Sequence, residues 1–278
     1  MSYMQISQKF YDAFKHCSFS HKSPHIARKL HAQLILSGLD TSLFLLNNLL
    51  NMYSKCGLIH DAFQVFQETY HRNIFTWNTM INALVNSGRM NEAENLFDEM
   101  PVRVKDSVSW TTMISGYTQN GFHARSIETF SLMLRESNNR GGNYDPFSFT
   151  SVMKACGSLG DSQLALQLHD LVVKLGFGME TCIQNSLVGM YVKCGNIDLV
   201  ETVFFDIERP SFIPNFMTYG SVLSACASIS DLKWGAHLHA RIFRMEHSLD
   251  LVLGNGLIDM YAKCGCLGLA KLVFLGIL

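Results

Sequence analysis

Apolar residues recur at helical spacing along the chain, in segments that are closed by a glycine. Between residues 45 and 53 they keep the i, i+3, i+4 period, and Gly57 follows as a stop signal. A second periodic segment starts at Ala62, and the same order of two segments around a glycine returns at Gly88 and Gly195. No alternating strand pattern persists in the sequence. The pattern therefore predicts an all-α chain of about eight helix pairs.

One phrase, Asn-x-Leu-x-x-Met-Tyr-x-Lys-Cys-Gly, occurs three times, over 47–57, 185–195 and 255–265, so the copies are offset by 138 and 70 residues. A second phrase, a cysteine followed further on by Leu-His, keeps the same 70-residue step. A third phrase, Trp-x-Thr-Met-Ile, begins at Trp77 and Trp110 and fills the gap between copies. Two unlike units alternate within each 70-residue step, and the step from Trp77 to Trp110 is 33 residues. Repeats of this length are typical of a solenoid, in which each repeat packs only on its neighbours.

We expect one continuous solenoid over 1–278, with approximate repeats at 7–42, 43–73, 74–106, 107–145, 146–180, 181–215, 216–250 and a shortened 251–278. The first 24 residues carry three lysines and no arginine, a poor match to an organellar transit peptide. We expect a first helix of a degenerate repeat there, and targeting stays open. The polar patch at 138–143 predicts an insertion in a loop between repeats.

Composition narrows the functional classes. Charged residues make up 16% against a typical ~25%, and apolar residues reach 48%, as expected for helices covered on more than one side. The formal net charge of −1 is not that of a nonspecific nucleic-acid binder, so any such binding must come from local patterning. No apolar run approaches the ~18 residues of a membrane span, and we expect no membrane partner.

The eight cysteines invite a metal or disulfide interpretation, but most follow the repeat. Cysteines in one register are displaced along a solenoid and would not converge on a single zinc ion. We therefore interpret them as small packed residues and expect no metal and no cofactor. The histidines of the Leu-His pairs are interpreted as packed or capping residues rather than bases. The cysteines of the two registers are Cys56, Cys194 and Cys264, and Cys17, Cys156 and Cys226; the histidines are His31, His169 and His239.

A polar stripe follows the first helix of each repeat. Asn47, Asn51 and Lys55 stand at i, i+4 and i+8, on one side of a helix. An amide at one fixed rung and an ammonium two turns away suit a ladder that contacts bases and phosphates. The alternative is an ordinary solvated face. Short hydrogen-bonding side chains recur where exposed helices favour Lys and Glu, which favours the ladder. The candidate phosphate contacts are Lys55, Lys193 and Lys263.

The three phrases resemble the alternating motifs of the plant pentatricopeptide repeat family, in the subclass with long, short and standard repeats. Residues 185–195 resemble its short motif, 77–88 its standard motif and 221–232 its long motif. Tetratricopeptide repeats would need Trp-x-x-Leu-Gly-x-x-Tyr, which is absent. The resemblance implies a right-handed α-α superhelix and an RNA-binding protein of an organelle, the mitochondrion or alternatively the chloroplast. It also implies that each repeat reads one base.

In the family, the fifth and last residues of a repeat choose the base, and the second residue packs on it. Carried over, the reading pairs are Asn47 with Asn73, Asn78 with Asp106, Thr111 with Asp145, and Asn185 with Asn215; Asn255 is the fifth residue of the last repeat. The packing residues are Phe44, Phe75, Val108 and Cys182. By the family's rules Asn with Asp favours U, Thr with Asp favours G, and Asn with Asn favours a pyrimidine. The long repeats, with Thr150 and Glu180 or Gly220 and Asp250, fit these rules poorly.

Many members of the subclass continue into a cytidine deaminase domain, which needs His-x-Glu and Pro-Cys-x-x-Cys. No histidine here is followed two residues later by Glu, and no Cys-x-x-Cys occurs. We therefore expect no catalytic centre, and a specificity factor for organellar RNA processing that acts with a deaminase or another enzyme recruited in trans. RNA editing is the first expectation, followed by splicing, stabilisation or cleavage. The expected partner is single-stranded RNA and not DNA. A protein-interaction scaffold and an enzyme with an unrecognised site are the alternatives.

Overall fold

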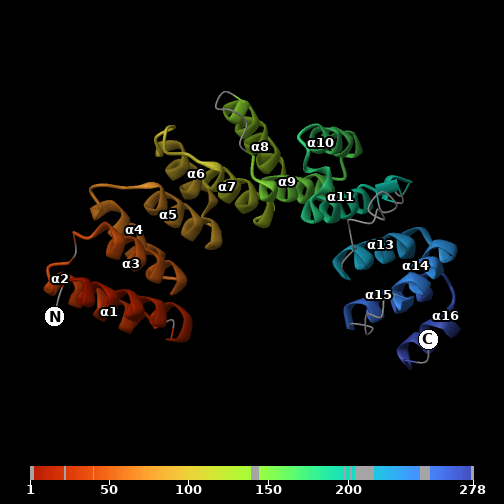
Figure 1. Cartoon of the computed structure of the whole chain (residues 1–278), viewed down its shortest axis with the longest axis horizontal. Coiled ribbons are helices and arrows are strands. Elements are labelled where there is room, and N and C mark those ends of the chain that lie inside the picture. The colour runs from red at the N-terminus through yellow and green to blue at the C-terminus, as the bar shows by residue number, and fades with distance from the viewer. Residues whose placement is uncertain are drawn as a thin grey trace. The chain divides into compact units, whose positions relative to one another are not determined.

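The computed structural model describes residues 3–39 except 22, then 41–138, 144–196, 198–200, 202–203, 216–244 and 251–276. These residues form α-helices joined by short turns, with no strand among them (Figure 1). A π-helical turn, Cys17–His21, follows the first helix, and a 3-10 turn, Phe177–Met179, precedes α11. The α-helices are α1 Tyr3–His16, α2 Pro24–Leu36, α3 Leu43–Lys55, α4 Ile59–Glu68, α5 Ile74–Asn86, α6 Met90–Glu99, α7 Ser107–Gln119, α8 His123–Asn138, α9 Pro146–Leu159, α10 Ser162–Lys174, α11 Thr181–Lys193, α13 Phe216–Ile229, α14 Leu232–Arg244, α15 Leu251–Lys263 and α16 Leu267–Phe274.

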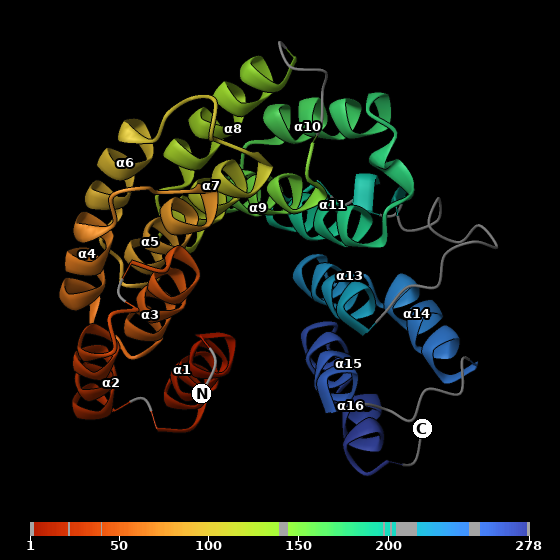
Figure 2. The same cartoon turned by 60° about the vertical axis from the view of Figure 1, so that its left-hand side comes forward.

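The chain divides into two compact units, Met1–Ser148 and Phe149–Leu278. In the first unit α1, α3, α5 and α7 pack on one another in that order, and α2, α4, α6 and α8 each pack on the helix that precedes them (Figure 2). In the second unit α11, α13 and α15 pack in the same way, and α14 and α16 cover α13 and α15. Each unit is thus a row of first helices with second helices against it, as the repeats predict.

The predicted all-α solenoid of helix pairs is confirmed, with differences at two places. The first helix begins at Tyr3, before the expected repeat boundary at residue 7, and confirms that this stretch is helical. Residue 138 belongs to α8, so the predicted loop insertion does not start there, and its remaining residues, 139–143, lie outside the described residues. Most of the second helix expected in the repeat 181–215 also lies outside them.

The glycine after each Lys-Cys pair ends the helix by adopting a left-handed conformation. Gly57 has φ +75°, and it follows Cys56, the C-cap residue of α3. The amide of Leu58 then donates to the carbonyl of Tyr53 at 2.9 Å, and that of Gly57 donates to Ser54 at 3.0 Å. These two bonds define a Schellman motif, which a side chain with a Cβ would strain. The chain therefore turns at once into the second helix.

The tryptophans of the standard repeats join neighbouring helix pairs. Trp77 of α5 packs edge-on against Phe66 of α4, with ring centroids 5.1 Å apart. Trp110 of α7 repeats this contact with Phe97 of α6 at 5.0 Å. A cation covers the free side of each phenylalanine: Arg72 in the first case and, in the second, Lys105, whose pKa is lowered by burial. Such aromatic pairs add about 0.5–1.5 kcal/mol beyond the burial of their surface.

The histidines of the Leu-His pairs join the long repeats to the short repeats that follow them. In all three copies the imidazole Nδ1 lies 2.9 Å from the hydroxyl of a buried tyrosine 22 residues later. The pairs are His31–Tyr53, His169–Tyr191 and His239–Tyr261. Burial raises the pKa of both Tyr53 and Tyr191 to about 12, so these hydroxyls stay protonated. The histidines are therefore packed, hydrogen-bonded residues.

We expect acid to destabilise the chain partly through His239. Burial lowers the pKa of His239 from its usual 6.5, so the unfolded chain takes up this proton at a higher pH than the folded chain. Its contribution to stability is complete above the unfolded pKa and falls as the pH drops through the folded pKa. His239→Asn should lower Tm near pH 7 by about 2–4 °C through the weakened bond to Tyr261, and should flatten the further fall of Tm towards lower pH. His237→Asn, at an exposed position of the same helix, is the control. Equal acid slopes in both variants would contradict the assignment.

Across the part of the chain that the structure describes, no helix is both long enough and apolar enough to cross a membrane.

Candidate nucleic-acid interface

In two places the last residue of one repeat is also the N-cap of the first helix of the next repeat. Asn73 caps α5 and Asp106 caps α7, each with extended backbone and a side-chain oxygen that accepts the amide of the third helical residue. In both caps the hydroxyl of that third residue, Thr76 or Ser109, accepts the backbone amide of the cap in return. This capping box fixes the cap side chain next to the preceding first helix.

Each cap lies against the fifth residue of the repeat that it closes. The amide nitrogen of Asn47 is 3.3 Å from Oδ1 of Asn73, and that of Asn78 is 3.3 Å from Oδ1 of Asp106. The structure therefore brings together the fifth and last residues that the sequence paired. All four side chains are half-buried, so part of each stays open to solvent.

The joint between Thr111 and Asp145 is built differently. Thr111 donates its hydroxyl to Oδ2 of Asp145 at 3.0 Å, and the other carboxylate oxygen accepts the amide of Phe147 at 3.0 Å. Here the fifth residue carries a hydroxyl rather than an amide, and its only proton is donated to the last residue. The chemistry presented at this rung therefore differs from that of the two asparagine rungs.

At both asparagine joints, the contacts of a fifth with a last residue, the third residue of the following helix contacts the fifth residue as well. The hydroxyl of Thr76 lies 2.7 Å from Oδ1 of Asn47 and 3.0 Å from Oδ1 of Asn73. That of Ser109 lies 2.7 Å from Oδ1 of Asn78 and 2.8 Å from Oδ1 of Asp106, so each hydroxyl can donate to the fifth residue or to the cap. Both hydroxyls are buried. Sequence reasoning missed them because a Thr or Ser at this helical position is explained by the capping box alone.

Apolar side chains recur at the second position of the repeats from Phe44 onward, and all of them except Cys182 are exposed. Phe75 is 69% exposed, and Phe44 and Val108 are also more than half exposed. Cys182 is half-buried. The row continues at second positions that the sequence analysis left out: Phe147, Met217 and Val252, which are likewise more than half exposed. The sequence could have revealed them, because each is an apolar residue at the second position of a long repeat or of the final repeat.

In the second unit Asn185 accepts a hydrogen bond from the buried hydroxyl of Thr218, the third residue of the next first helix. Its predicted partner Asn215 lies outside the described residues, as does Asp250. Asn255 is exposed on α15.

The three predicted phosphate-binding lysines lie in the last turns of α3, α11 and α15 and are exposed. They occupy different surroundings. Lys55 lies over the ring of Phe19, 4.1 Å from its centroid. Lys263 forms an ion pair with Asp259 at 2.9 Å, one helical turn back on the same face. The end of a helix favours a cation whether or not RNA is bound.

In two of the three copies a cysteine of one register lies beside a cysteine of the other, which the sequence analysis did not foresee. Sγ of Cys17 lies 4.0 Å from Sγ of Cys56. Burial raises the pKa of Cys156 to about 12, and it also raises the pKa of its neighbour Cys194. Such thiols remain protonated and are poor metal ligands. Among the described residues, no group of three or more His, Cys, Asp or Glu could hold a metal ion.

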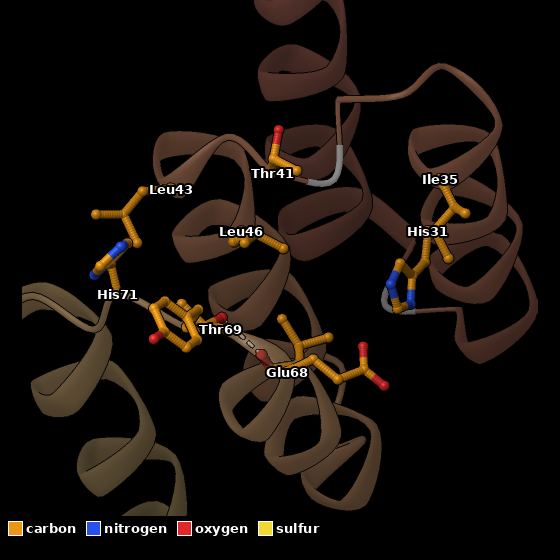
Figure 3. A pocket seen from close by; sticks show the side chains of 10 residues that line it. His31, Ile35, Thr41, Leu43, Leu46, Glu68, Thr69 and His71 are labelled. Carbon is orange, nitrogen blue, oxygen red and sulfur yellow. Dashed lines mark hydrogen bonds between the residues drawn. The ribbon is translucent and has the colours of Figure 1, made fainter.

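A pocket of about 470 Å³ lies in the first unit between α2, α3 and the end of α4 (Figure 3). Its apolar lining includes Ile35, Leu43 and Leu46, and Glu68 and His71 also line it. The hydroxyl of Thr69, also in its lining, is already committed to the carbonyl of Val65 at 2.7 Å. None of the predicted RNA-binding residues lines this pocket.

The chain matches the model of the PPR repeat family over residues 72–103, and the PPR repeat model over 44–74, 108–138, 147–177 and 185–209. PPR stands for pentatricopeptide repeat, and the matches together cover more than half of the chain. The chain belongs to the pentatricopeptide repeat family.

Pentatricopeptide repeat-containing proteins of Arabidopsis thaliana are similar to it over most of its length. One is 32% identical over 96% of the chain and 42% of its own length. Another, described as chloroplastic, is 27% identical over 87% of the chain and 39% of its own length. A third, described as mitochondrial, is 29% identical over 74% of the chain and 38% of its own length. The chain thus spans about two-fifths of the length of these relatives.

Solved structures agree on the fold. Pentatricopeptide repeat protein PPR10 from maize superposes with a TM-score of 0.68 at 18% identity, over 95% of this chain and 38% of that one. PPR10 in complex with an 18-nucleotide RNA element superposes with a TM-score of 0.56, over 90% of this chain and 42% of that one. At this level of identity the likeness establishes the fold.

Proposed function

We propose that this pentatricopeptide repeat chain binds single-stranded RNA by sequence, with one standard or short repeat for each base that it reads. The observation that carries the proposal is the repeated rung: a fifth residue held against a last residue, beside an exposed apolar side chain at the second position. Half-buried amides and a hydroxyl can hydrogen-bond a base edge, and an exposed phenylalanine can stack on a base. The structures of PPR10 with RNA support this proposal for the fold.

The roles follow from these positions. Asn47 with Asn73, Asn78 with Asp106, Thr111 with Asp145, and Asn185 with Asn215 would choose the bases, and Asn255 would belong to the following rung. Phe44, Phe75, Val108 and Cys182 would pack on them. Read in parallel with the chain, these units favour pyrimidine, U, G, an unread base and pyrimidine from 5′ to 3′. The unread position belongs to the long repeat that contains Thr150.

Selection of bound RNA from a random single-stranded pool tests the proposal directly. Enriched molecules should carry the stated order, and a duplex DNA of the same sequence should not compete. Enrichment without any common order, or equal competition by duplex DNA, would contradict sequence-specific RNA binding.

We further propose that the chain is a specificity factor for RNA processing in an organelle, with the mitochondrion first and the chloroplast second. Relatives described as mitochondrial and as chloroplastic support an organelle without favouring either. RNA editing is the proposed process because of the alternating long, short and standard repeats, and splicing, stabilisation or cleavage come next. A deaminase or another processing enzyme recruited in trans would supply the chemistry. Loss of the protein should therefore alter one or a few organellar transcripts that contain the selected sequence.

Replacement of the three lysines tests their proposed phosphate contacts. Lys55→Ala, Lys193→Ala and Lys263→Ala should each weaken binding to all RNAs alike, and each should lower the slope of log K against log salt by about 0.7. Lys174→Ala is the matched control, because Lys174 forms a similar exposed ion pair with Asp170 on the second helix α10. If the triple variant had the same slope of log K against log salt as the unmodified chain, the lysines would not contact phosphates.

A further inference from the structure

We propose that Thr76, Ser109 and Thr218 are positioning residues for base selection, each of which sets the orientation of the reading amide of the preceding repeat. The inference rests on the proposed function and adds a third member to each rung. These hydroxyls are buried and therefore cannot contact RNA themselves. They would act through Asn47, Asn78 and Asn185.

The joint at Asn78 gives the clearest case. Asp106 is acceptor-only when ionised, so only the amide nitrogen of Asn78 can make a favourable bond to it. The amide oxygen then faces Ser109, whose hydroxyl lies 2.7 Å from it and 2.8 Å from Oδ1 of Asp106. The amide oxygen is the nearer of the two acceptors for the single hydroxyl proton. A flipped amide would set its oxygen against the carboxylate of Asp106, and two acceptors repel each other. Asp106 and Ser109 therefore hold the amide from both ends.

The same arrangement recurs with other residues. The side-chain nitrogen of Asn47 donates to Asn73, and its oxygen lies 2.7 Å from the hydroxyl of Thr76, which is 3.0 Å from Oδ1 of Asn73. Asn185 accepts the hydroxyl of Thr218 in the second unit. In all three joints the donor is a buried Thr or Ser three residues into the next first helix. A buried hydroxyl must place its proton on an acceptor, and the amide oxygen provides one.

A fixed amide presents a fixed pattern to a base. One N–H of the amide and one lone pair of its oxygen are used inside the protein, which leaves one donor and one acceptor for the ligand. U and C differ in donors and acceptors on their pairing edges, so an amide that could flip would accommodate both. The buried hydroxyl should therefore contribute to discrimination between bases more than to total affinity.

The joint at Thr111 provides an internal control. Ser148 occupies the same third position and is also buried, but its hydroxyl donates to the backbone carbonyl of Asp145 at 2.7 Å. The reader there is a hydroxyl that donates to the carboxylate of Asp145. Removal of the Ser148 hydroxyl should therefore perturb a helix start without loosening a reading amide.

The test compares Ser109→Ala, Ser109→Thr and Ser148→Ala in the full chain, with two measurements. In the free protein, the side-chain amide hydrogens of Asn78 should exchange faster by NMR in Ser109→Ala than in the unmodified chain. With RNA oligonucleotides that differ only at the base facing Asn78, the preference for U over C should fall by about 2- to 10-fold in the same variant. Ser109→Thr should restore both values, because Thr76 fills the equivalent site. Ser148→Ala should leave both unchanged at that position.

The proposal is overturned if Ser109→Ala keeps the exchange rate and the base preference of the unmodified chain and loses only thermal stability, as expected for a helix cap. The proposed function fails in a different way. An unmodified chain without base preference at that position would refute sequence reading, while the exchange of the Asn78 amide would still report whether Ser109 orients it.

Discussion

Thr111→Asn should change the base preference of one rung from G to U and leave the neighbouring rungs as they are. The substitution replaces the hydroxyl that donates to Asp145 with an amide, and so produces the pair found at Asn78 and Asp106. By analogy with other base-reading contacts, the discrimination is about 1–3 kcal/mol, or about 5- to 150-fold in Kd. We expect the smaller end of that range, because Ser148 gives its hydroxyl to a backbone carbonyl and the new amide would be held by Asp145 alone.

The measurement is a set of dissociation constants for oligonucleotides that carry each base at that position. Thr112→Asn is the control, because it adds the same amide on the next residue of the helix, where the hydroxyl donates to the backbone carbonyl of Val108. If Thr111→Asn weakened every RNA equally, or if preference moved at another position, the register of repeats and bases proposed here would be wrong.

Phe75→Ala should weaken RNA binding strongly while leaving the protein as stable as before. The ring is 69% exposed in the free protein, so its removal opens little cavity, whereas loss of a stacked base is worth about 1–3 kcal/mol. Kd should therefore rise by about 5- to 150-fold for RNAs of any sequence at that base, since every base has a face on which a ring can stack.

Phe243→Ala is the matched control for that experiment. Phe243 is 66% exposed but lies on the second helix α14, away from the second positions of the repeats. Its loss should affect neither RNA affinity nor Tm by much. Equal affinities of the Phe75→Ala and Phe243→Ala variants would mean that exposed rings on this protein do not stack on bases.

The fold could be predicted from the sequence because its signals are local and repeated. A glycine after a periodic helix, as at Gly57, specifies a left-handed turn wherever it occurs, and its recurrence gives the period. The pairing of fifth and last residues came from the family resemblance. The structure adds its physical reason: the last residue is an N-cap, so capping geometry fixes where its side chain lies.

Contacts between repeats could not be predicted in the same way. The hydroxyl of Ser109 lies near both Asp106 and Asn78, and its approach to Asn78 depends on the spacing of α5 and α7 in three dimensions. The approach of Cys17 to Cys56 likewise depends on how two helix pairs stack. A pattern along one chain specifies which face of a helix is apolar, but not which atom of a neighbour it meets.

Because the last residue of a repeat is also an N-cap, few residue types can be placed there to change the base preference of such a protein. A side chain at the position of Asp106 must serve the base and also hold the first turn of the next helix. Good caps number about five residue types, and alanine in their place weakens a helix by about 1 kcal/mol. Residue types that contact a base but cap poorly would destabilise the first helix of the following repeat. Only a few residue types therefore suit this position. The fifth position caps no helix, so a substitution there can change base preference without removing an N-cap, although Asn78 also accepts a hydrogen bond from the buried hydroxyl of Ser109.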